Sequence, residues 1–322
     1  MNIDKIRAAQ VRISGRIRKT PLLNAPLLDE IAGRRVWVKA ECLQHTGSFK
    51  YRGALSAITA LSDAERENGI LAFSSGNHAQ GIALAAKQAG APAVIIMPAD
   101  APRIKIENTQ SLGAETVFYD RVAGEDRDVI GDKLAQERGL TLIKPFDNEE
   151  VIAGQGTAGL EIAQQAKGEN ITQADVIVCC GGGGFASGIA LALEAEAPGM
   201  TVRPAEPENF DDVARSLTAG ERLSNSRVSG SICDAIITPS PGELTFPILS
   251  RLAGPGLVVS DTEALKAMAL AFSHLKIVAE PGGVVALAAA LFRSDHLDGE
   301  DVIVTVSGGN VDPEIFQKAL AT

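Results

Sequence analysis

Short apolar runs alternate with longer amphipathic stretches along nearly the whole chain of 322 residues. This alternation is typical of parallel strands covered by helices, because such strands are apolar throughout and their helices are apolar on one side. The pattern predicts an α/β fold. The predicted strands are residues 36–39, 69–73, 93–97, 115–118, 175–180, 257–259 and 301–306, and the predicted helices are residues 78–88, 101–112, 124–138, 156–167, 185–196, 262–274 and 282–292.

One long segment does not follow the pattern. Residues 202–247 are irregular and rich in Pro and Ser. A structureless stretch of this length inside a compact domain is uncommon, so we expect a long excursion from the sheet rather than a separate domain.

Charge and the N-terminal sequence exclude some classes of protein. The formal net charge is −10 and the pI is about 5.0, whereas a general nucleic-acid binder needs a basic face to neutralise phosphates. Residues 1–20 mix charged with apolar side chains, so neither a signal peptide nor a membrane span is predicted. We expect a cytoplasmic protein with no membrane or nucleic-acid partner.

Four consecutive glycines, Gly181, Gly182, Gly183 and Gly184, follow one predicted strand and precede the helix that begins at Phe185. Converging backbone N–H groups and the helix dipole make such a turn a seat for a phosphate. No Gly-Lys-Ser/Thr follows, which excludes a nucleotide P-loop. A dinucleotide site stays open, because the spacing of the glycines approximates that fingerprint and Glu206 lies where a ribose ligand is expected.

A second polar turn, Ser74-Ser75-Gly76-Asn77-His78, also joins a predicted strand to a predicted helix. Hydroxyl, amide and backbone N–H groups at a helix N-terminus suit a carboxylate. The alternative is an ordinary N-cap, but a cap needs only one of these residues, so the cluster favours a carboxylate site. The turns at Ser307-Gly-Gly-Asn310 and Glu280-Pro-Gly-Gly283 are each explained as structure alone.

Two further segments have both a chemical and a plain interpretation. Lys50 lies in Thr-Gly-Ser-Phe-Lys-Tyr-Arg-Gly at the expected start of a helix, where it is either a solvated side chain or a desolvated amine able to form a Schiff base. The acidic run from Glu206 to Asp212 is either a solvated loop or a set of oxygen ligands for a divalent cation.

Taken together and in order, these motifs resemble the fold-type II pyridoxal-phosphate enzymes of the threonine/serine dehydratase and serine racemase group. The resemblance rests on Ser48-Phe-Lys-Tyr-Arg-Gly-Ala54, Ser74-Ser-Gly-Asn-His78, Ala153-Gly-Gln-Gly-Thr157, the glycine run and Ser307-Gly-Gly-Asn310. It implies two open, mostly parallel sheets flanked by helices, as in tryptophan synthase beta-like folds. It also implies a large cofactor domain (1–71 and 148–322), a small mobile domain (72–147) that closes over the substrate, and a homodimer.

The resemblance also implies roles for individual residues toward pyridoxal 5′-phosphate and an amino-acid substrate. Lys50 would form the Schiff base and move the α-proton. The implied cofactor-binding residues are Phe49, Lys50, Asn77, Gly181, Gly182, Gly183, Gly184, Phe185 and Ser307. The implied substrate-binding residues are Ser74, Ser75, Asn77 and His78. Glu206, Phe210 through its carbonyl, and Asp212 would bind Mg²⁺ or another divalent cation.

The implied activity is that of an ammonia-lyase (dehydratase), which converts L-threonine to 2-oxobutyrate and L-serine to pyruvate. Ser75 introduces an alternative, because in the racemase branch a serine here returns the α-proton on the other face. Serine racemase and hydroxyaspartate dehydratase therefore stay open within the family. A dinucleotide-binding oxidoreductase and a non-catalytic binding protein stay open outside that activity. Since the chain ends at Thr322, feedback through a C-terminal regulatory domain is not expected.

Overall fold

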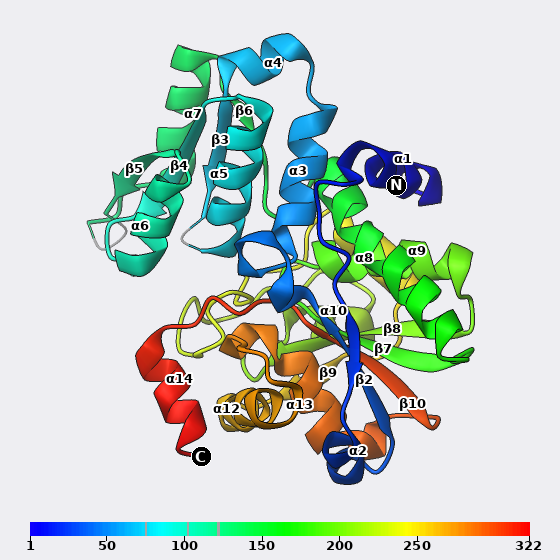
Figure 1. The fold of residues 1–322 in the computed structure, drawn as a ribbon. Coiled ribbons are helices and arrows are strands. Elements are labelled where there is room, and N and C mark those ends of the chain that lie inside the picture. The colour runs from blue at the N-terminus through cyan, green and yellow to red at the C-terminus, as the bar shows by residue number, and fades with distance from the viewer. Residues whose placement is uncertain (75, 102, 121–122) are drawn as a thin grey trace.

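The computed structural model describes residues 1–74, 76–101, 103–120 and 123–322. Two separate sheets form the framework, with helices around each (Figure 1). In the larger sheet only β1 runs antiparallel to its neighbour, and the other strands are parallel. Its strand order is β1 (Leu22–Asn24), β2 (Arg35–Ala40), β10 (Asp301–Val306), β7 (Ala174–Cys179), β8 (Met200–Pro207) and β9 (Leu257–Val259).

Helices cover both faces of the larger sheet because its central strands are apolar on both sides. In β7, Val176 and Val178 belong to one apolar cluster, while Ile177 and Cys179 belong to another. The first cluster is completed by α8 (Glu149–Gly168), α9 (Gly184–Glu196), α10 (Asp212–Ala219) and α11 (Thr245–Leu252), with α1 (Ile3–Ile13) outside them. The second is completed by α2 (Pro26–Ala32), α12 (Asp261–Leu270), α13 (Val285–Phe292) and α14 (Pro313–Leu320).

The smaller sheet is wholly parallel. Its strands, in spatial order, are β5 (Glu115–Tyr119), β4 (Ala93–Pro98), β3 (Ile70–Phe73) and β6 (Thr141–Leu142). One face packs on α3 (Lys50–Ala60) and α5 (Asn77–Ala89), and the other packs on α7 (Arg127–Arg138). The short α4 (Asp63–Asn68) leads into β3, and α6 (Arg103–Ser111) lies between β4 and β5 in the chain.

The predicted α/β class with two mostly parallel sheets is confirmed, and each of the seven predicted strands overlaps an observed one. The prediction of an irregular excursion over residues 202–247 is wrong at its start. Strand β8 pairs with β7 and β9, so it lies inside the sheet. The strand was not predicted because it contains charged residues. These residues are tolerated in the sheet because Arg203 pairs with Asp175, and Glu206 accepts hydrogen bonds from the first turn of α10.

Helix α8 begins earlier than predicted, at Glu149 after the N-cap Asn148. The glycines of the Ala153-Gly-Gln-Gly-Thr157 motif obscured this start, since glycine disfavours helices. Their purpose is close packing. A Cβ at Gly154 would lie 2.5 Å from the carbonyl oxygen of Arg52 in α3, and a Cβ at Gly156 would lie 2.9 Å from that of Gly188 in α9.

Candidate active site

A cavity of about 210 Å³ receives residues that follow strands of both sheets. Ser74 follows β3, the glycine run follows β7, and Ser307 follows β10. The carboxyl ends of parallel strands are the usual place for a ligand in α/β folds. The cavity is lined by Phe49, Lys50, Phe73, Ser74, Gly76, Asn77, His78, Lys105, Arg127, Pro145, Phe146, Cys179, Cys180, Gly181, Gly182, Gly183, Gly184, Phe185, Ala186, Asp234, Ala235, Ile236, Thr238, Glu280 and Ser307.

Lys50 is the first residue of α3, and its amine lies in this cavity. The Nζ atom donates to the carbonyl oxygen of Pro145 at 3.1 Å and lies 5.1 Å from the centroid of the Phe49 ring. Burial lowers the pKa of Lys50 to about 8, while the charge of Glu280 acts in the opposite direction. The amine is therefore far more available as a nucleophile or base near neutral pH than an ordinary lysine.

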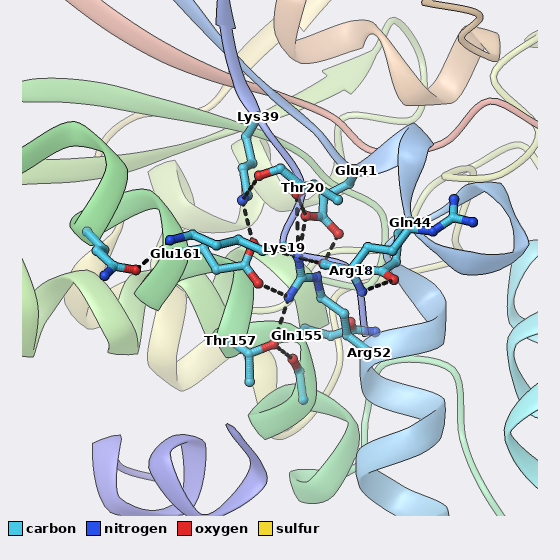
Figure 2. A network of polar contacts seen from close by, with 12 residues as sticks. Arg18, Lys19, Thr20, Lys39, Glu41, Gln44, Arg52, Gln155, Thr157 and Glu161 are labelled. Atoms are coloured by element: carbon cyan, nitrogen blue, oxygen red, sulfur yellow. Dashed lines mark hydrogen bonds and ion pairs between the residues drawn. The ribbon is translucent and has the colours of Figure 1, made fainter. Parts of the chain in front are cut away.

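A buried ionic network anchors the helix that carries Lys50 (Figure 2). Arg52, fully buried one half-turn later, binds both carboxylate oxygens of Glu41 and both of Glu161 at 2.7–2.9 Å. Lys39 donates to Glu161 at 2.5 Å, so two cations face two carboxylates. Because Glu41 follows β2 and Glu161 lies on α8, the network fixes the first turn of α3 to the larger sheet.

The glycine run has no room for side chains. A Cβ at Gly182 would lie 2.3 Å from the Phe146 ring, and one at Gly184 would lie 2.9 Å from Phe146. Gly183 caps α9 with φ of +89°, a left-handed conformation that favours glycine. The carbonyl oxygen of Gly182 accepts a hydrogen bond from Thr245 Oγ1 at 2.6 Å, and the first turn of α9 leaves N–H groups without intrahelical acceptors. This turn is suited to an anion.

Asn77 is held in one orientation by two neighbours. Its Nδ2 donates to Glu280 Oε1 at 2.6 Å, and its Oδ1 accepts from Asn310 Nδ2 at 2.7 Å. Burial raises the pKa of Glu280 to about 7, against the hydrogen bond from Asn77 and the charges of Lys105 and Lys50. The sequence interpretation treated the Glu280 turn as structural only, and the carboxyl group next to Pro-Gly-Gly was the available signal.

The neighbouring turn at Ser74 to His78 has one histidine whose protonation is defined by its contacts. His78 Nε2 donates to the carbonyl oxygen of Ile143 at 3.0 Å, and burial with the charge of Lys50 lowers the pKa of His78 to about 3. The neutral ring therefore carries its proton on Nε2, so a carboxylate would be bound by backbone N–H groups here rather than by the ring. Ser75, predicted as catalytic, lies outside the described residues.

Phe49 and Phe185 form an aromatic wall of the cavity. Their rings stack with centroids 4.0 Å apart and planes 15° from parallel. Ser307, at the end of β10, is almost buried, and its carbonyl oxygen accepts from the backbone N–H of Phe49 at 3.1 Å. Within the described residues, the site residues predicted from distant parts of the sequence are thus brought together, except for the acidic run.

The acidic run lies apart from the cavity. Glu206 Oε1 and Oε2 accept from the backbone N–H groups of Val213 and Ala214 at 2.9 and 2.7 Å, and Asp212 accepts from Asn225 Nδ2 at 2.6 Å. Within the part of the chain that the structure describes, no group of three His, Cys, Asp or Glu side chains is placed to hold a metal. Glu206 does not line the described cavity, so it would not contact a ribose bound there.

Two cationic side chains of the cavity were missed by the sequence interpretation. Lys105 of α6 pairs with Asp234 at 2.7 Å, and the guanidinium of Arg127 lies 5.9 Å from the Phe73 ring centroid. Both are ordinary helix residues in sequence, and Asp234 is 129 positions away from Lys105.

No helix of the described ranges is long and apolar enough to cross a membrane.

Comparisons with known proteins identify the family of the chain. Residues 13–309 match the model of a family described as pyridoxal-phosphate dependent enzyme. The chain is 41% identical over 317 residues to an L-threo-3-hydroxyaspartate ammonia-lyase of a Pseudomonas species, covering 98% of this chain and 97% of that protein. Its structure is similar to a T.th. threonine deaminase (TM-score 0.91, 42% identity, 97% and 99% of the two chains) and to maize serine racemase (TM-score 0.90, 34% identity, 99% and 97%).

Proposed function

Because the chain belongs to the family of pyridoxal-phosphate dependent enzymes, we propose that it is an ammonia-lyase acting on a β-hydroxy-α-amino acid. It would release ammonia and leave a 2-oxo acid. The observation that carries the proposal is the amine of Lys50, which lies in the cavity with its pKa lowered to about 8 by burial. Such an amine can bond to an aldehyde and can accept a proton near neutral pH.

The residues of the cavity fit the cofactor. The turn at Gly182 excludes any side chain and suits a phosphate, while Lys50 would hold the aldehyde carbon through its amine. Ser307 would face the pyridine nitrogen and Asn77 the ring hydroxyl, with Phe49 beside the ring. When bound, the cofactor supplies an electron sink for the α-carbon of the substrate.

The protein's own groups would perform the remaining work. The backbone N–H groups at Asn77 and His78 would bind the substrate α-carboxylate, with Ser74 beside them. Lys50 would take the α-proton on its neutral amine, after which the β-hydroxyl leaves as water. A hydroxyl such as that of Ser307 does not keep a pyridine nitrogen protonated as a carboxylate would, which favours elimination over long storage of negative charge.

The similar proteins are named for three different substrates, hydroxyaspartate, threonine and serine. Their names therefore do not favour threonine or serine over hydroxyaspartate as the substrate of this chain. Serine racemisation is a separate outcome that depends on Ser75. Chiral chromatography of the unreacted amino acid distinguishes the two activities, because only a racemase produces the D-isomer.

Purified holoenzyme should release ammonia from β-hydroxy amino acids and absorb visible light through its bound cofactor. Lys50→Ala should lose both properties, whereas Lys87→Ala, an exposed change on α5, should lose neither. Undiminished turnover in Lys50→Ala would overturn the proposal. Binding of NAD(H) by calorimetry, with no cofactor absorption, would instead favour the oxidoreductase alternative.

Four further parts of the proposal stay predictions. The homodimer and the cytoplasmic location can be tested by light scattering and cell fractionation. The small mobile domain, proposed over residues 72–147, contains most of the four-stranded sheet, although α3 shares its apolar core. A divalent cation at Glu206, Phe210 and Asp212 would contact Asp212 Oδ2, which is buried and has no hydrogen-bond partner among the described residues.

A further inference from the structure

Lys105 places a cation on the wall of the active-site cavity. Its side chain is only 10% exposed, yet its Nζ atom reaches Asp234 Oδ2 at 2.7 Å, and Asp234 also lines the cavity. A Cβ at Gly76 would lie 3.9 Å from this Nζ atom. The ammonium group therefore lies beside the turn proposed to bind the substrate α-carboxylate.

The surroundings keep this ammonium group charged. Burial opposes the charge, but Asp234, Glu280 and Asp312 outweigh it and raise the pKa of Lys105. None of the steps proposed for Lys50 requires a second buried cation. The side chains of threonine and serine offer it no anion beyond the α-carboxylate that every substrate has, whereas a dicarboxylic substrate offers a second carboxylate.

The ion pair is asymmetric in a way that suits exchange. Lys105 is almost buried, whereas the side chain of Asp234 is 53% exposed and can return to water. A carboxylate that enters the cavity could take the place of Asp234 on the ammonium group without leaving a buried charge unpaired. Arg127 lines the same cavity and adds positive charge there.

We infer that Lys105 is a specificity-determining residue that binds the distal carboxylate of a 3-hydroxy dicarboxylic amino acid, displacing Asp234. This inference rests on the proposed ammonia-lyase function and names the substrate class of that site. The α-proton and the β-hydroxyl leave together as one water, and a second water then hydrolyses the C–N bond. The net products are ammonia and a 2-oxo dicarboxylate, with no oxidant or reductant consumed.

The test compares holoenzyme variants on L-threo-3-hydroxyaspartate, L-threonine and L-serine. Lys105→Gln should lower kcat/KM for hydroxyaspartate by about 10–100-fold, mainly through KM, because a charge-assisted bond is lost. Its effect on threonine and serine should be less than about 3-fold. Lys105→Arg should keep the preference for hydroxyaspartate, and Asp234→Asn should lower the KM for hydroxyaspartate by removing the competing carboxylate.

Failure of the inference about Lys105 and failure of the proposed ammonia-lyase function give different results in these assays. An equal loss on all three substrates in Lys105→Gln overturns the inference, because Lys105 would then serve the shared α-carboxylate. If the wild type releases ammonia from none of them, the proposed function fails. Binding of succinate, followed by the change in the visible spectrum of the holoenzyme, then tests the site alone. The wild type should bind succinate more tightly than propionate. An equal affinity for succinate in Lys105→Gln overturns the inference. If Lys105→Gln binds no cofactor, the same comparison is made with Asp234→Asn, and no gain for dicarboxylates overturns it.

Discussion

Replacing Arg52 by methionine would leave two buried carboxylates with one cation between them. Arg52 and Glu41 are both fully buried, and Glu161 is almost so. Removal of one partner from a buried ion pair costs about 3–5 kcal/mol of unfolding free energy. We expect a loss in this range for Arg52→Met, because Lys39 contacts Glu161 but cannot replace the fork of bonds to Glu41.

The loss should also depend on pH with a defined sign. In the wild type, Glu41 has a lowered pKa: burial raises it, but the charge and hydrogen bonds of Arg52 and the charge of Lys39 prevail. Its contribution to stability is therefore present above the ordinary carboxyl pKa and disappears in acid. Without Arg52, burial raises the pKa of Glu41, and a protonated Glu41 no longer needs a counter-ion. The difference between wild type and Arg52→Met should shrink from pH 8 to pH 5.

Urea unfolding followed by circular dichroism over this pH range provides the measurement. Arg251→Met is the matched control, because Arg251 pairs with Glu194 while both side chains are about half exposed, and it should cost less than about 1 kcal/mol. Arg52→Lys should fall between the two, since it keeps the charge and loses the fork. A loss for Arg52→Met no larger than that of Arg251→Met, or one that does not change with pH, would refute the electrostatic reasoning.

Three other changes should have distinct effects. Gly182→Ala places a methyl group against the Phe146 ring and should weaken cofactor binding at least about 10-fold, as measured by absorbance titration. Gly168→Ala meets no atom of the described residues within 4 Å and should leave cofactor binding unchanged. The rate at which apoenzyme combines with pyridoxal phosphate should rise through about pH 8, because the lowered pKa of Lys50 makes its amine neutral above that value; a rise that continues to pH 10 would contradict this. Millimolar Mg²⁺ should raise the Tm of the wild type but not of Asp212→Asn, and an equal response of both proteins would remove the cation from the proposal.

Strands were predictable where an apolar local sequence matched a buried position in the sheet. The strands over residues 257–259 and 301–306 were predicted with their observed bounds, because each is a short apolar run ended by polar or glycine residues. Strand β8 was missed because Arg203, Pro204 and Glu206 disguise it. The buried charge of Arg203 is paired with Asp175, which is 28 positions away, so no local window could show that it is compatible with a central strand.

The site divided in the same way. The glycine run and Asn77 lie in turns that follow β7 and β3, where the rule for ligand sites in parallel sheets directs the search. Lys50 lies at the start of α3, and its sequence motif singled it out. Lys105 carries no such signal, because its partner Asp234 is 129 positions away. Glu280 stands beside a Pro-Gly-Gly turn, but its hydrogen bond joins it to Asn77, which is 203 positions away. The predicted sites were those that a turn defines, and the missed ones are those that only tertiary contact defines.

Helix α3 is joined to both halves of the molecule at different points along its length. Its first turn is tied by Arg52 to Glu41 and Glu161, and its later turns share an apolar core with β3 and α5. If the four-stranded sheet moves as the proposed small domain, we expect its hinge to lie at the start of α3. Such a movement would carry the turn that begins at Ser74 toward or away from the cofactor while the amine of Lys50 stayed almost still. Binding of the substrate carboxylate could thus change without a change in the position of the reactive amine.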